Sequence, residues 1–162
     1  MIRWVAAGLL LMLYAAPAGL RAGPFVISLE VSDEAKKQTA QLQPAAKANA
    51  IVKRPSLKAA AGARFTAKWK VSSGSKELMK DVLVHFYVVR IDKPGQMPPP
   101  LEPKSVVIES ALTMDFAAKD ITSGELQFRP LGAGIYLVRI EAQDPAQPRE
   151  REYFAAMDLV VK

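Results

Sequence analysis

The feature that most constrains the fold of this chain is a two-residue alternation of apolar and polar side chains. The alternation is most regular in residues 64–71, where Phe65, Ala67, Trp69 and Val71 are separated by Thr and Lys residues. Successive side chains of a β-strand point to opposite faces of the sheet, so this pattern predicts a strand with one buried face and one solvated face.

Other short apolar segments follow along the chain, and turn residues separate them. About seven short strands with no long helix predict an all-β fold, an antiparallel β-sandwich, over residues 56–162. The further expected strands are residues 82–91, 106–116, 125–129, 135–142 and 153–161. The expected core side chains are Phe65, Trp69, Phe86, Phe128, Tyr136, Val138 and Ile140.

The composition supports one compact domain and removes several classes of protein. The chain has 162 residues, and 50% of them are apolar, which is enough to bury a core. It has no Cys, which excludes zinc fingers, disulfide scaffolds, Cys proteases and thioredoxin-type enzymes. With only 9 Gly and 12 Pro, the chain is neither collagen-like nor wholly disordered.

The first 22 residues have the pattern of an export signal. Arg3 provides a positive charge, and residues 5–16 form an apolar run that is too short to span a membrane. Ala16-Pro17-Ala18 has the small residues of a cleavage site, and Leu20-Arg21-Ala22 is a second option. An uncleaved signal anchor is the alternative. Cleavage predicts a secreted or periplasmic protein that has no membrane span.

Residues 23–55 differ from the rest of the chain in composition. Residues 25–32 alternate like a strand, whereas residues 33–55 are rich in Ala, Lys and Gln and contain no aromatic residue. Asp33 is a possible cap for a short helix that would run to Leu42, before Pro44. We therefore expect an N-terminal strand followed by a flexible linker, with at most one or two loose helical turns.

Two adjoining segments have unusual patterns. Residues 82–91 are apolar on both faces, which predicts a central strand whose outer face is at least partly shielded.

Residues 94–103 contain five prolines, which lack a backbone donor and cannot join a sheet. We expect this loop to stand out as a stiff spacer. It either connects two strands around the sandwich, which is the commoner case, or serves as a recognition tip.

Residues 130–144 carry a resemblance to known modules. A Gly-containing turn leads into Tyr136, and Val138, Ile140 and Ala142 alternate after it. This stretch resembles the penultimate strand of Ig-like and fibronectin type III-like modules found in secreted bacterial proteins, and Trp69 matches their core Trp. The resemblance implies an Ig-like sandwich in which the Tyr136 hydroxyl bonds to nearby backbone. It points to no specific family.

The sequence offers little support for catalysis. His85 is the only His, so a metal site would lack a second His or any Cys, and a Ser-His-acid site would depend on this one residue. Paired carboxylates for glycosidase-type chemistry are the remaining option, but the acidic residues are scattered. We expect a non-enzymatic protein with no catalytic residues, cofactor or metal.

Basic residues suggest a binding face. If the 64–71 strand pairs with the strand at 125–129 and with one near Leu57, outward cations gather on one sheet. The candidate binding residues are Lys58, Arg64, Lys68, Lys70 and Arg129. Such a face suits an anionic envelope component, an extracellular protein or an acidic polymer, and the alternative is an ordinary solvated surface. Nucleic acid is a poor fit, because outward aromatic residues are lacking.

These observations predict a secreted, non-catalytic binding module that engages an anionic partner through a basic sheet face. The alternative is a structural envelope or assembly component that pairs by β-strand addition, with residues 25–32 as the donor strand.

Overall fold

The computed structural model describes residues 24–34, 36–41, 53–146 and 153–162. The predicted signal peptide and residues 42–52 of the predicted linker lie outside these ranges. The described part of the chain contains nine strands and no helix. They are β1 (Phe25–Ser32), β2 (Lys37–Gln41), β3 (Ser56–Ala59), β4 (Phe65–Ser73), β5 (Met79–Ile91), β6 (Val106–Phe116), β7 (Ile121–Phe128), β8 (Gly134–Gln143) and β9 (Tyr153–Val161).

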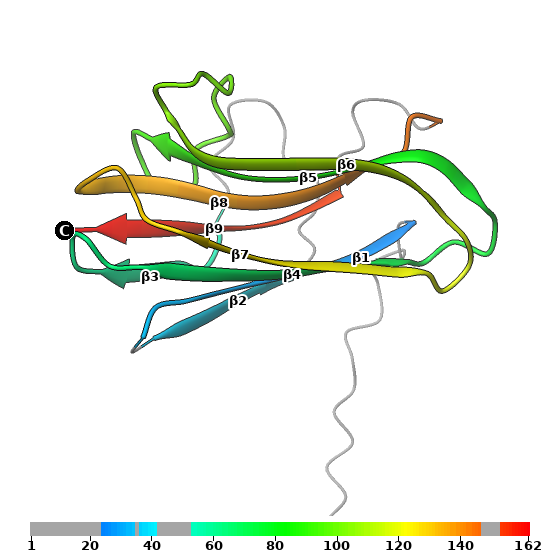
Figure 1. Ribbon diagram of the computed structural model, residues 1–162, viewed down its shortest axis with the longest axis horizontal. Coiled ribbons are helices and arrows are strands. Elements are labelled where there is room, and N and C mark those ends of the chain that lie inside the picture. The colour runs from blue at the N-terminus through cyan, green and yellow to red at the C-terminus, as the bar shows by residue number, and fades with distance from the viewer. Residues whose placement is uncertain (1–23, 35, 42–52, 147–152) are drawn as a thin grey trace, which may run out of the picture.

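The strands form two sheets that lie face to face (Figure 1). The four-stranded sheet has the order β2-β1-β4-β7, and the five-stranded sheet has the order β3-β9-β8-β5-β6. Neighbouring strands are antiparallel except for β3 and β9, which are parallel. The predicted all-β sandwich is confirmed, with nine strands in the described ranges in place of about seven.

The core lies between the two sheets and is built from the alternating apolar residues. On β4, Phe65, Ala67 and Val71 are fully buried and Trp69 is 8% exposed. Burying a large apolar side chain contributes about 1.5–3 kcal/mol, so these rows of side chains hold the sheets together. Every core residue expected from the sequence is buried: Phe65, Trp69, Phe86, Phe128, Tyr136, Val138 and Ile140.

Trp69 depends on a glycine of the neighbouring strand. It lies opposite Gly124 of β7, where a Cβ atom would come within 2.5 Å of the indole Cζ2. Any larger residue at position 124 would therefore collide with the ring, which explains why an edge strand carries Gly at its centre.

The N-terminal strand belongs to the sandwich. β1 lies between β2 and β4, and its inward side chains are fully buried. The flexible linker expected after the first strand, like the possible short helix between Asp33 and Leu42, is wrong for Lys37–Gln41, which form β2 and pair with β1. Their cross-strand hydrogen bonds and the burial of Ala40 outweigh the helix propensity of this segment. The sandwich thus begins at Phe25, before the expected first residue, Ser56.

β5 is a central strand buried on both faces, as its sequence predicted. Its outer side chains Tyr87, Val89 and Ile91 join a second apolar cluster on the outside of the five-stranded sheet. The proline-rich loop does not stand away from the sheet as expected, because Leu101 packs on this cluster. Figure 1 shows the loop between β5 and β6 rising over the outer face. It connects two strands and also shields apolar surface.

The corner before β8 has the hydrogen bond that the resemblance implied. Tyr136 is fully buried, and its hydroxyl donates to the carbonyl oxygen of Gly132 at 2.9 Å. The bond satisfies the only polar atom of the side chain, so the ring can be buried at little cost.

None of the described segments forms a helix with the length and apolar character needed to cross a membrane.

Candidate functional site: a basic hollow at one end of the sandwich

Two arginines lie at the same end of the sandwich, where β4 begins and β7 ends. Phe65 and Phe128 are paired residues of these strands, and their rings stack at 5.5 Å between centroids. Arg64 precedes Phe65 and Arg129 follows Phe128, so both side chains leave the sheet just outside this stacked pair. Both are exposed, and neither forms an ion pair with a carboxylate of the described residues.

Both arginines line an open hollow of about 620 Å³. Small residues form part of its wall, and Gly62 adopts a φ of 80° in the turn before Arg64. That left-handed conformation favours glycine, and a Cβ atom at this position would meet no other part of the chain within 4 Å. Its lining residues are Asp33, Glu34, Lys36, Ala59, Ala60, Gly62, Ala63, Arg64 and Arg129.

Lys36 adds a third cation from the turn between β1 and β2. The turn is closed by two hydrogen bonds: Lys36 N donates to Asp33 Oδ1 at 2.6 Å, and Asp33 N donates to Lys36 O at 2.9 Å. Lys36 Nζ donates to the Lys58 carbonyl at 3.0 Å, which ties the turn to β3. Asp33 and Glu34 partly offset the three cations, and the hollow keeps a small positive excess.

Lys58 does not belong to the predicted basic face. The expectation that the strand near Leu57 pairs with β4 is wrong, because β1 occupies that position. β3 instead pairs in parallel with β9 in the other sheet, with Leu57 opposite Leu159. The side chain of Lys58 therefore lies on the five-stranded sheet, although its carbonyl reaches Lys36.

Lys68 and Lys70 do lie on the outer face of the four-stranded sheet, but Lys68 has acidic neighbours and Lys70 lies opposite Ser28 and Ser123. Lys68 stands between Glu30 and Glu125 in the strand register and forms an ion pair with Glu125 at 3.2 Å. Glu30 is paired in turn with Lys37 at 2.7 Å. This face carries alternating charges rather than a basic stripe. Of the five predicted residues, the structure brings only Arg64 and Arg129 together at the hollow.

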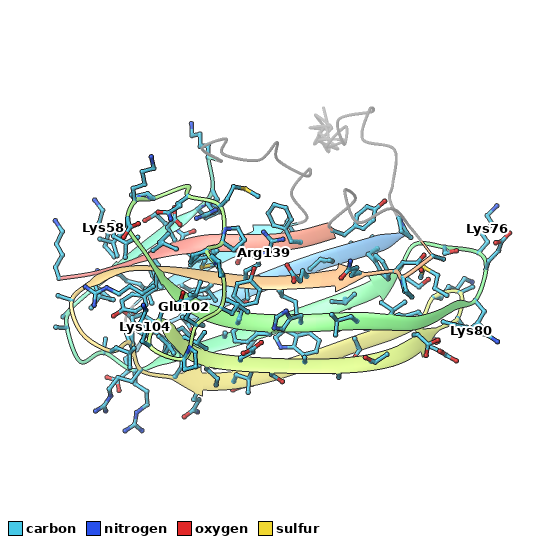
Figure 2. All side chains as sticks on the ribbon, turned by 90° about the horizontal axis from the view of Figure 1, so that it is seen from above. Lys58, Lys76, Lys80, Glu102, Lys104 and Arg139 are labelled. Carbon is cyan, nitrogen blue, oxygen red and sulfur yellow. The ribbon has the colours of Figure 1, made fainter. Side chains whose placement is uncertain are left out.

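The second charged group is a network on the outer face of the five-stranded sheet. His85 of β5 lies between carboxylates of both neighbouring strands: Nε2 is 2.8 Å from Glu109 of β6, and Nδ1 is 3.3 Å from Glu141 of β8. Arg139 Nε donates to Glu141 at 2.7 Å, and its guanidinium lies 4.0 Å from the ring centroid of Phe154. Arg139, 2% exposed, lies near the middle of this face (Figure 2).

The carboxylates control the protonation of His85. The hydrogen bond to Glu141 is the main cause that raises the pKa of His85 above its usual value, against the opposing effect of burial. Burial alone would raise the pKa of Glu141, but the hydrogen bond from His85 and the charge of Arg139 hold it below its usual value. The described residues contain no group of three or more side chains placed to hold a metal ion.

A third group of charges is almost completely buried. Arg54 Nη2 and Asp158 Oδ1 are 2.7 Å apart, and their side chains are 2% and 4% exposed. Asp158 Oδ2 accepts a bond from Gly95 N at 2.9 Å, and Arg54 donates to the carbonyl of Gln96. Sequence reasoning missed this pair, although Asp158 was the one charge within an apolar C-terminal strand. The pair fastens the start of the proline-rich loop to β9.

The sequence matches no protein-family model and no curated protein. Among solved structures, the chain is similar to a crystal structure described as the C-terminal domain of wzt. The sequence identity is 9% and the TM-score is 0.45, and the match covers 87% of this chain and 75% of that chain. At this level the similarity carries no argument about function.

Proposed function

We propose that this chain is a secreted or periplasmic, non-catalytic binding module that holds an anionic group in the basic hollow. The observation that carries the proposal is the pair Arg64 and Arg129, two exposed arginines that line the same hollow without carboxylate partners among the described residues. A guanidinium offers a rigid fork of donors that matches a carboxylate or a phosphate. Lys36 adds a point charge to the same hollow.

The hollow suits binding rather than chemistry. The described residues that line it include no His, Ser, Thr or Tyr that would serve as a nucleophile. Its open shape suits a charged group that belongs to a larger partner, such as an anionic polymer or an acidic protein surface. The proposal of export is based on the pattern of residues 1–22. Mass spectrometry of the protein recovered from an exporting cell tests it, since cleavage of the signal peptide changes the N-terminal residue and the mass.

The binding test uses the mature chain with polygalacturonate as a carboxylate probe and inorganic phosphate as a phosphate probe. Affinity is measured by calorimetry or by chemical-shift titration at low and high salt. Arg64→Gln together with Arg129→Gln should weaken binding by about tenfold or more for each arginine, since charge-assisted hydrogen bonds contribute about 1.5–3 kcal/mol. Wild-type binding should fall with added salt, because the site is exposed.

The matched control is Lys76→Gln together with Lys80→Gln. It removes the same charge from the opposite end of the sandwich, where Figure 2 places both lysines far from Lys58. This control should bind like the wild type. Equal losses in both variants would reveal a general charge effect and contradict the site. Binding of neither probe by the wild type would also contradict it.

A further inference from the structure

The free edge of the five-stranded sheet is long, and the one bulge of its edge strand lies near the start of that strand, at Val107. β6 is the last strand of that sheet and runs for 11 residues, whereas the opposite edge strand, β3, has 4. Natural proteins protect exposed edges with Lys, Pro or very short strands. β6 contains no Lys, Arg or Pro.

The two carboxylates of β6 do not protect its edge. Glu109 is bound to His85 at 2.8 Å, and Asp115 accepts a hydrogen bond from Asp81 N at 3.0 Å. Both partners lie on β5, so both carboxylates are already engaged on the side away from the free edge. His85 thereby offsets the charge of Glu109, and a backbone donor of β5 holds the Asp115 carboxylate.

The inward side of β6 is incompletely covered. Ile108, Leu112 and Met114 pack on the core but remain only partly buried, and Ser110 between them is exposed. On the inner strand β5, the paired residues Val82, Val84, Phe86 and Val88 are buried. An added strand beside β6 would cover this partly open apolar row.

We infer that β6 pairs with β6 of a second copy in antiparallel fashion, about a twofold axis at Ala111. In this register Leu112 of one copy lies opposite the exposed Ser110 of the other, and Met114 lies opposite Ile108. The carboxylates meet no like charge: Glu109 faces Thr113, and Asp115 lies beside the end of the partner strand, where a bulge at Val107 ends the regular register of β6. Moving the axis to Leu112 would oppose Glu109 and Asp115, which disfavours that register.

The pairing joins the two five-stranded sheets into one continuous sheet. It gives the row of unpaired β6 backbone groups hydrogen-bond partners and buries the partly exposed apolar residues. The edge strand β7 is a poorer candidate, because it is shorter and its centre is Gly124. This inference does not depend on the anionic site, which lies at the end of the sandwich.

The test is sedimentation of the mature chain over a wide concentration range. The wild type should dimerise, and Ala111→Lys and Ala111→Glu should each weaken the dimer at least about tenfold, because like charges meet at the twofold axis. A mixture of the two variants should regain association, since Lys then faces Glu. Circular dichroism checks that each variant is folded.

Ser123→Lys is the control, because it places the same charge outward on β7, an edge strand of the four-stranded sheet. It should leave the dimer unchanged. The inference is overturned if the wild type stays monomeric at every concentration, or if the dimer tolerates Ala111→Lys. It is also overturned if Ser123→Lys disrupts the dimer equally, or if the mixed variants fail to associate.

Discussion

The outer faces of the two sheets both carry ion pairs, but in different surroundings. On the four-stranded sheet, Lys68 and Glu125 are 3.2 Å apart and their side chains are 56% and 52% exposed. On the five-stranded sheet, Arg54 and Asp158 are 2.7 Å apart and almost fully buried. Water screens the first pair and has been removed from the second, so similar charges have very different consequences for stability.

The difference arises from what lies over each face. The proline-rich loop packs on the outer side of the five-stranded sheet, where Figure 2 shows Glu102 and Lys104 above the strands. The strands beneath it bury apolar residues on both faces. The alternating strands of the four-stranded sheet leave one face to solvent. A loop therefore converts one outer face into a second, smaller core.

The largest effect is expected for Asp158→Asn. This change leaves the buried Arg54 without its charged partner, and breaking such a pair costs about 3–5 kcal/mol. The free energy of unfolding, measured with urea, should fall by that amount. A loss below about 1 kcal/mol would show that this buried pair contributes no more to stability than an exposed ion pair does.

A smaller loss is expected for Arg139→Met. The substitution keeps much of the side-chain volume over Phe154 but removes the donor to Glu141 Oε2, while Oε1 keeps its bond to His85. A mostly buried carboxylate oxygen left without its donor costs about 1–3 kcal/mol. Urea unfolding measures the effect, with Lys70→Met on the solvated face as control, where a change within about 0.5 kcal/mol is expected. Equal effects at both positions would remove the distinction between the faces.

The pH dependence of stability should come from His85 and Glu141 on the outer face of the five-stranded sheet. His85 has a raised pKa in the folded state, so its contribution is complete below the ordinary pKa of 6.5 and is lost as the pH rises through the folded value. Glu141 has a lowered pKa, so its contribution is complete above its ordinary value of 4.5 and is lost as the pH falls through the folded value. Stability should be greatest between these limits.

Urea unfolding of the wild type and of His85→Gln, each measured from pH 5.5 to 8.5, tests the histidine part. The wild type should lose stability toward high pH, and the variant should show a flatter profile. His85 is the only His in the chain, which makes the assignment direct. An unchanged slope in His85→Gln would refute it.

The smallest effect is expected on the solvated face. Glu125→Gln removes the ion pair with Lys68 and should change the free energy of unfolding by about 0–1 kcal/mol. Added salt should reduce even this difference, since the pair is exposed. A change as large as that of Asp158→Asn would show that exposure does not separate the two faces.

The sequence predicted those parts of the fold that depend on the pattern of a single strand or turn. The alternation in β4 predicted which of its side chains are buried. The resemblance around Tyr136 implied a hydrogen bond from its hydroxyl to nearby backbone, and that bond is present. β2 was missed because Ala40 is its only buried apolar residue. Its strand conformation depends on pairing with β1, which residues 37–41 do not reveal by themselves.

The charged sites were predicted less well. Their members are far apart in the sequence and come together only through the pairing of strands, which the sequence pattern does not reveal. His85 meets Glu109 and Glu141, which are 24 and 56 residues away, and Arg54 meets Asp158 across 104 residues. Arg64 and Arg129 were named as outward cations of two strands that were expected to pair, and those strands, β4 and β7, do pair. Lys58 was misplaced because the order of strands in the sheets is not visible in the pattern of one strand.

The position of β9 also sets the order of events when the chain folds. Its residues follow all the other described strands, yet it lies between β3 and β8. During synthesis, β3 and β8 lack their common neighbour until residues 153–161 have emerged. Contacts between such distant segments form slowly, because long loops must close first. The larger sheet can therefore be completed only after its last strand has been made.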